Sequence, residues 1–340
     1  MAPQPTTALA VVLGCMTIGD AAHSQSRIKS EEEEKAFLDA FASHGHTMLD
    51  TAIMYSSGSC EKHLGSLDLP SRGLVVATKI YPTASAFPGA PVPQYSHTRE
   101  CIRATLAESL SSLQTPSVDL YYLHAPDRNT PFLDSLRAIT ELHQEGRFAR
   151  FGVSNYTAAD MREMLALCEQ HNLLKPTVYQ GMYNALHRAV ELELLPLLRE
   201  HGIAFYAYNP LAGGYLTDRY QRDTKLEGLE RGSRFDPSTF QGKGYIARYW
   251  NDAMFDALEL LRPVAKKFGL GEAECALRWM MHHGLLEAKF GDAVVVGASS
   301  VAQLEGNLTL MEKGPLPEEV LRVLDQGWQR TKDVNVKYWH

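Results

Sequence analysis

Four polar side chains lie at or just beyond the ends of short apolar segments, and their types suit proton transfer: Asp50, Tyr55, Lys79 and His124. The apolar segments that precede them cover residues 47–49, 74–78 and 118–123. If these segments are parallel strands of one barrel, all four side chains open onto its C-terminal face, where such barrels keep their chemistry. A tyrosine, a lysine, a carboxylate and a histidine form an acid–base set that contains no nucleophile.

The elements that must position these side chains alternate between strand-like and helix-like segments, as in a parallel sheet with crossover helices. The strand candidates cover residues 11–13, 47–50, 74–78, 118–123, 148–153, 177–180, 203–208 and 294–296. With at least eight helices between and after them, this pattern predicts one α/β domain over residues 1–340, a single (β/α)8 TIM barrel. The barrel core covers about residues 8–312 and has long loops at its C-terminal face, and an additional C-terminal helix with a tail covers about 316–340.

Capping residues and helical spacing locate several of the helices. Ser30 and Glu33 form a capping box at the start of one helix, and Thr157 and Asp160 begin another. Further helices are expected over residues 102–113, 132–145, 189–200, 252–282, from about 300, and 317–330. Residues 80–97, with four prolines, and the Gly-rich residues 209–247 are predicted to be long loops, and the second is long enough to be functional.

Composition excludes several classes of function. The 340 residues are 45% hydrophobic and 21% charged, which is typical of a soluble globular protein, and the net charge of −7 comes with no basic patch for nucleic acid. No secretory signal or membrane span is recognisable, and the five cysteines form no CxxC, so we expect a cytoplasmic protein with reduced thiols. The histidines lack companions at metal-ligand spacing, so no metal is expected. Homodimer and monomer both remain open.

Several motifs together resemble the aldo-keto reductase superfamily. Leu49-Asp50-Thr51-Ala52-x-x-Tyr55 resembles its LDTAxxY segment, and Lys79 and His124 complete the superfamily's tetrad. Gly152-Val153-Ser154-Asn155 and Asn209-Pro210-Leu211-Ala212-Gly213-Gly214 are two further matches. Within the superfamily, the chain most resembles the aflatoxin-aldehyde reductase branch. The motifs that carry this resemblance are Arg234-Phe235, Tyr245-x-x-Arg248-Tyr249-Trp250 and Ser299-Ser300-x-x-Gln303-Leu304.

The resemblance implies an NADPH-dependent reductase of aldehydes and ketones, in which each member of the tetrad has a role. Tyr55 would give a proton to the carbonyl oxygen, and Lys79 would lower the pKa of the phenol, which is near ~10 when unperturbed. Asp50 would keep Lys79 protonated by charge pairing. His124 would hydrogen-bond the carbonyl oxygen, most usefully as a neutral imidazole.

The hydride must come from a cofactor, because no side chain can supply one. Residues 14–19 lack the spacing of a GxGxxG motif, so a Rossmann dinucleotide domain is not expected. The resemblance implies instead an extended NADPH/NADP+ across the barrel mouth. Its nicotinamide would contact Ser154, Asn155, Gln180 and Tyr208, and its pyrophosphate Asn209, Pro210, Leu211, Gly213 and Arg219. Its 2′-phosphate and adenine would contact Arg234, Ser299, Ser300, Gln303 and Asn307, and Met16 is a further expected cofactor contact.

Substrate contacts implied by the branch are Tyr245 and Arg248, in addition to His124. His340 stands at the C-terminus, where the resembling animal enzymes commonly have an arginine, so acidic aldehydes are expected to be weaker substrates here. A cofactor-binding accessory subunit, similar to the potassium-channel β-subunits, is the alternative to a free enzyme, because those subunits retain the tetrad. The segment with Tyr245 and Arg248 favours the enzyme.

Overall fold

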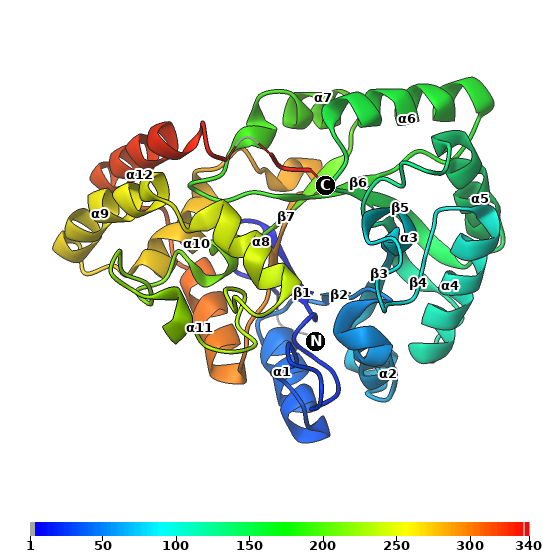
Figure 1. Ribbon diagram of the computed structural model, residues 1–340, viewed down its shortest axis with the longest axis horizontal. Coiled ribbons are helices and arrows are strands. Elements are labelled where there is room, and N and C mark those ends of the chain that lie inside the picture. The colour runs from blue at the N-terminus through cyan, green and yellow to red at the C-terminus, as the bar shows by residue number, and fades with distance from the viewer. Residues whose placement is uncertain (1–3, 336, 340) are drawn as a thin grey trace.

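The chain folds as a closed barrel of eight parallel strands, in the order in which they occur in the sequence (Figure 1). The computed structural model describes residues 4–335 and 337–339. The strands are β1 (Ala10–Gly14), β2 (Met48–Asp50), β3 (Val75–Ile80), β4 (Val118–Leu123), β5 (Phe148–Ser154), β6 (Val178–Met182), β7 (Ala204–Tyr208) and β8 (Ala293–Val296). The predicted (β/α)8 barrel is confirmed, and each predicted strand lies within two residues of an observed one.

Helices surround the barrel and connect its strands (Figure 1). They are α1 (Glu31–Ser43), α2 (Ser59–Gly65), α3 (Thr83–Ala86), α4 (Arg99–Ser112), α5 (Phe132–Gln144), α6 (Ala158–His171), α7 (Leu194–Glu200), α8 (Phe240–Tyr249), α9 (Asp252–Lys267), α10 (Glu272–His282), α11 (Val301–Met311) and α12 (Glu318–Thr331). The two predicted caps are present, because Ser30 accepts from the Glu33 N–H and Thr157 accepts from the Asp160 N–H. The predicted C-terminal helix is α12, which packs mainly against α9.

Three segments differ from the sequence-based expectation, and the shortest is the single turn α3, which lies within the predicted loop over residues 80–97. The stretch over residues 209–247 is not loop throughout, because α8 begins at Phe240 after the cap Thr239. Two glycines obscured its helical pattern, and Gly242 is needed there because a Cβ would lie 1.9 Å from the carbonyl oxygen of Asp236. The helical region over residues 252–282 is two helices, α9 and α10, and Gly269 with φ 68° lies in the turn between them.

The strand period of two determines which side chains enter the barrel. Ala77 belongs to the small cluster of buried residues contributed by alternate strand positions, together with Leu120 and Tyr122 of β4. Lys79 lies two residues after Ala77 and therefore points to the same side. Because parallel strands end at one face of the barrel, this register brings Asp50 and Lys79 together at the C-terminal end.

The long segment after β7 has a core of its own. Tyr215, Phe235, Tyr249 and Phe255 belong to a buried cluster separate from the main one, and their rings contact one another in pairs. This packing fixes residues 212–255 against the barrel mouth, so the segment forms a wall there. Among the described residues, no helix is long and apolar enough to cross a membrane.

Candidate active site

Lys79 is the centre of the polar cluster predicted from the sequence. Its ammonium donates to Asp50 Oδ2 at 2.6 Å, to the Thr51 carbonyl oxygen at 2.7 Å and to the Tyr55 hydroxyl at 3.4 Å. The Lys79 side chain is 0% exposed and that of Asp50 4%. Burial by itself would lower the pKa of Lys79, but the charge of Asp50 and the contact with Tyr55 reverse this effect and raise it. Lys79 is therefore a cation beside the phenol oxygen at neutral pH.

Tyr55 combines a transferable proton with contact to both Lys79 and solvent. It lies just after β2, is partly exposed, and its ring is 4.9 Å from Lys79 Nζ. Burial raises the pKa of Tyr55, and the positive charge of Lys79 lowers it by a smaller amount, so the net direction is upward. Lys79 thus acts on the phenol in the predicted direction, and burial, which the sequence does not reveal, outweighs it. The phenol is protonated at neutral pH.

His124 follows β4 and lies beside the phenol. Its ring centroid is 5.9 Å from that of Tyr55, in an edge-to-face arrangement. It is 5.3 Å from the ring of Tyr81, again edge to face. The four side chains predicted from the sequence therefore meet at one point of the barrel mouth, with Tyr55 and His124 forming its accessible side.

Three polar side chains from neighbouring strands continue this mouth. Gln180 of β6 donates to Asp50 Oδ1 at 2.8 Å, so it holds the carboxylate that pairs with Lys79. Asn155, which has a positive φ of 65° after β5, donates to the carbonyl oxygen of His124 at 2.9 Å and to Ser154 Oγ at 3.0 Å. Tyr208, at the end of β7, donates to Asn155 Oδ1 at 2.7 Å. The residues predicted to contact a nicotinamide are thus assembled around the tetrad.

The turn after β7 carries the residues predicted to contact a pyrophosphate, namely Asn209, Pro210, Leu211 and Gly213. Asn209 has a φ of 61°, and its side-chain oxygen accepts from the Tyr245 hydroxyl at 2.8 Å. Gly213 has a φ of 70°, and a Cβ there would lie 2.3 Å from the Tyr245 ring. The turn is therefore shaped to fit under α8, which carries Tyr245.

The cations expected at the far end of a dinucleotide differ in their surroundings. Arg234 donates to Gln241 Oε1 at 2.7 Å and contacts Met16 Sδ at 3.1 Å, so its partners in the described part of the chain are neutral atoms. Arg219 is exposed and pairs with Glu230 at 3.4 Å. Because its charge is not used in an ion pair among these residues, Arg234 is the better suited of the two to bind a phosphate.

The start of α11 forms a second polar cluster. Ser300 caps the helix by accepting from the Gln303 N–H at 3.2 Å, and Ser299 donates to Gln303 Oε1 at 2.7 Å. Asn307, one helical turn further on, is partly exposed. A helix N-terminus with hydroxyl groups is suited to an anion.

Comparison with known proteins identifies the family. The family model described as "Aldo/keto reductase family" matches residues 10–329. The chain belongs to the aldo/keto reductase family. It is 43% identical to "Aldo-keto reductase pigE" of Monascus ruber over 337 residues, which cover 99% of this chain and 98% of that protein. It is 41% identical to "Aflatoxin B1 aldehyde reductase member 2" of Homo sapiens over 332 residues, covering 96% and 89%. The resemblance to the aflatoxin-aldehyde reductase branch is thereby confirmed, and the protein is an oxidoreductase.

A solved structure supports the same fold for this aldo/keto reductase. An aldo/keto reductase from Klebsiella pneumoniae, solved in complex with NADP and acetate, superposes with a TM-score of 0.65 over 96% of each chain. The sequences are 22% identical, so this similarity concerns the barrel alone.

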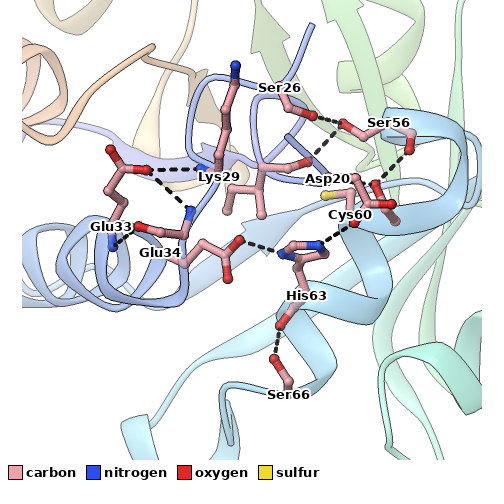
Figure 2. A network of polar contacts seen from close by, with 12 residues as sticks. Asp20, Ser26, Lys29, Glu33, Glu34, Ser56, Cys60, His63 and Ser66 are labelled. Atoms are coloured by element: carbon pink, nitrogen blue, oxygen red, sulfur yellow. Dashed lines mark hydrogen bonds and ion pairs between the residues drawn. The ribbon is translucent and has the colours of Figure 1, made fainter. Parts of the chain in front are cut away.

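The loop between β1 and α1, which carries Met16, is fastened to α2 by a polar network (Figure 2). His63 of α2 connects two carboxylates. Its Nδ1 lies 2.6 Å from Glu34 Oε1, and its Nε2 lies 2.9 Å from Asp20 Oδ1. Ser26 donates to Ser56 Oγ at 3.3 Å nearby. Burial lowers the pKa of His63, but the hydrogen bonds to Asp20 and Glu34 outweigh it and raise the pKa. This aldo/keto reductase thus holds its first mouth loop against the helix that follows Tyr55.

The predicted substrate contacts are only partly described. Arg248 of α8 is partly buried, and its guanidinium lies 3.3 Å from Met182 Sδ. The tail returns to the C-terminal face, where the Tyr338 hydroxyl accepts from the Ala158 N–H at 3.2 Å. His340 lies outside the described residues. No group of His, Cys, Asp and Glu residues suited to a metal ion occurs in the described part of the chain.

Sequence reasoning missed three aromatic residues beside the tetrad: Tyr81, Phe87 and Phe240. A signal was present for Tyr81, because it lies two residues after Lys79 and so on the same side of the strand. No local pattern connects Phe87 with Phe240, because they are far apart in the sequence and meet only in the folded protein.

Proposed function

We propose that this aldo/keto reductase reduces aldehydes and ketones to alcohols, with NADPH as the hydride donor and Tyr55 as the proton donor. The observation that carries the proposal is the buried ammonium of Lys79, which bonds both Asp50 and the Tyr55 hydroxyl. Such a cation stabilises the phenolate that remains after the proton has left.

Reduction of a carbonyl requires a proton donor for its oxygen, and Tyr55 is protonated at neutral pH. NADPH supplies the hydride to the carbonyl carbon, and the oxygen then needs one proton. Tyr55 holds that proton at neutral pH because burial raises its pKa, and Lys79 lowers the cost of giving it up. His124, beside the phenol, orients the carbonyl oxygen by a hydrogen bond.

The chemistry of the side chains supports NADPH as the cofactor. Asn155 and Gln180 offer amide groups beside the tetrad, and Tyr208 offers an aromatic face at the end of β7. Arg234, with only neutral partners among the described residues, offers a charge for a 2′-phosphate. A cofactor with that phosphate gains charge-assisted hydrogen bonds that NADH lacks, so NADPH is preferred. The Klebsiella pneumoniae structure that shares this barrel was solved with NADP.

A cofactor-binding accessory subunit is the second candidate, because it would need the same fold and tetrad. The relatives that match nearly the whole chain carry the names of reductases, which favours the enzyme. Oxidation of NADPH in the presence of 4-nitrobenzaldehyde, followed by absorbance, distinguishes the two. An accessory subunit would bind NADPH without turning it over.

The decisive experiment is the replacement Tyr55→Phe. It removes the proton donor and leaves the ring, so kcat should fall by about 10²–10⁴-fold while the Kd for NADPH stays within about twofold. Tyr220→Phe is the matched control, because it makes the same chemical change in the separate cluster after β7. Turnover of Tyr55→Phe equal to that of the control would refute the role of Tyr55.

A further inference from the structure

The ammonium of Lys79 has an aromatic neighbour in addition to its hydrogen-bond partners. Its three N–H groups are used by Asp50, by the Thr51 carbonyl oxygen and by the Tyr55 hydroxyl. Its Nζ also lies over the ring of Tyr122, 5.7 Å from the ring centroid. Because the Lys79 side chain is 0% exposed, solvent does not reach the rest of its charge. The ring of Tyr122 therefore covers a part of the ammonium that no hydrogen bond covers.

The register of three neighbouring strands brings this ring to the lysine. Lys79 of β3 is the partner of Tyr122 of β4, and Tyr122 is the partner of Gly152 of β5. Tyr122 belongs to the cluster inside the barrel, as does Ala77, which points to the same side as Lys79. The three paired positions therefore form one row across the interior of the barrel, directly below the catalytic mouth.

The third position of the row leaves room for the ring. Gly152 has no positive φ, so its backbone conformation does not require glycine. A Cβ at this position would lie 2.5 Å from both Cδ1 and Cε1 of Tyr122. Any side chain at position 152 would thus displace the ring that lies over Lys79.

A buried ammonium loses the water that would surround it, and the negative face of an aromatic ring compensates for part of that loss. Tyr122 is 0% exposed, and burial together with the charge of Asp50 raises its pKa well above the ordinary value. The ring therefore stays neutral and keeps its negative face. Among the three hydrogen bonds of Lys79, that to the Tyr55 hydroxyl is the longest, at 3.4 Å, so it depends most on how the ammonium is held.

We propose that Tyr122 is a positioning residue for carbonyl reduction, whose ring face holds the Lys79 ammonium beside the Tyr55 hydroxyl in a space that Gly152 leaves open. This inference rests on the proposed reductase function and adds to it a residue outside the tetrad. Tyr122 acts through Lys79 and contacts neither the carbonyl nor the hydride.

The test removes the aromatic face and measures turnover of 4-nitrobenzaldehyde with NADPH in the full-length protein. Tyr122→Leu should lower kcat by about tenfold, which corresponds to about 1.4 kcal/mol, and leave the KM for NADPH within about twofold. Tyr122→Met should behave in the same way, and because it leaves a smaller cavity it serves where the leucine variant does not fold. Tyr122→Phe keeps the ring and loses only the hydroxyl, so its kcat should stay within about twofold of the wild type.

Tyr121→Leu is the matched control, because Tyr121 is the preceding residue of β4, is 1% exposed and belongs to the main cluster outside the barrel. It creates a similar cavity and should leave kcat within about twofold. In a Lys79→Met background, Tyr122→Leu should cause no further loss of the residual turnover, because the ring then has no ammonium to hold.

Four results would each overturn the role of Tyr122. These are wild-type kcat in the leucine and methionine variants, an equal loss in Tyr122→Phe, an equal loss in Tyr121→Leu, and the full tenfold loss in the Lys79→Met background. Failure of the proposed function would appear differently, as absence of turnover in the wild type.

Discussion

Replacing Asp50 by asparagine removes the countercharge of a lysine that has no access to solvent. Lys79 is 0% exposed, and its other two partners, the Thr51 carbonyl and the Tyr55 hydroxyl, are neutral. In the wild type, burial lowers the pKa of Lys79 and the charge of Asp50 more than reverses this effect. In Asp50→Asn, burial dominates, so the pKa of Lys79 should fall below its ordinary value.

The sign of the pH dependence follows from these directions. In the wild type, the raised pKa gives stabilisation that is complete below the unfolded pKa of about 10.4, so it is constant between about pH 6 and about pH 9. In the variant, there is a pH range between the lowered pKa of Lys79 in the folded state and its pKa in the unfolded state. In this range Lys79 is neutral in the folded state and charged in the unfolded state, so the folded state binds fewer protons. Its stability therefore rises with pH, by up to about 1.4 kcal/mol per pH unit. We expect a deficit of about 3–5 kcal/mol near pH 6 that becomes smaller towards pH 9.

Urea denaturation of both proteins at about pH 6, about pH 7.5 and about pH 9 measures this difference. Asp119→Asn is the control, because it breaks the ion pair of Asp119 with Arg150 Nη2 at 2.5 Å, and a guanidinium does not titrate in this range. The control should lower stability by a similar amount at every pH. If the deficit of Asp50→Asn were also independent of pH, Lys79 would not depend on Asp50 for its charge, and the reasoning about the tetrad would be refuted.

Two further predictions concern the cofactor and the first mouth loop. Arg234→Ala should raise the KM for NADPH by about tenfold and leave the KM for NADH nearly unchanged. Steady-state kinetics with both cofactors would check this, and equal changes in the two KM values would exclude a phosphate contact. His63→Gln can donate to one of the two carboxylates, Glu34 or Asp20, through its NH2 group, but it cannot become charged. Because the pKa of His63 is raised, its stabilisation is complete below about pH 6.5 and is lost as pH rises through the folded pKa. The variant should therefore be about 1–2 kcal/mol less stable than the wild type near pH 5.5 and closer to it near pH 9 in urea denaturation, and a constant difference would contradict this account.

The sequence alone predicted the barrel and the tetrad because both depend on local patterns. Each strand is a short apolar run with a polar residue at its end, and parallel strands of a barrel end at one face. That geometry brings Asp50, Tyr55, Lys79 and His124 together without any knowledge of the loops. The caps at Ser30 and Thr157 were equally local, because each depends on a residue three positions further on.

Sequence patterns failed where glycine or distance interrupts the signal. α8 was expected to be loop, because Gly242 and Gly244 lower the helical propensity of a segment that is held in place by tertiary packing. The lowering effect of Lys79 on the pKa of Tyr55 was predictable from the sequence, whereas the burial that outweighs it is a property of the whole mouth.

Only the tertiary structure brought together residues that have no sequence relation. Phe87 follows α3 and Phe240 begins α8, and their contact depends on how these two helices pack over the barrel. In the same way, His63 meets Glu34 and Asp20 only because α1, α2 and the loop after β1 lie side by side. The polar residues at the strand ends determine which chemistry the barrel can perform, and the packing of its long loops forms the surroundings of that chemistry.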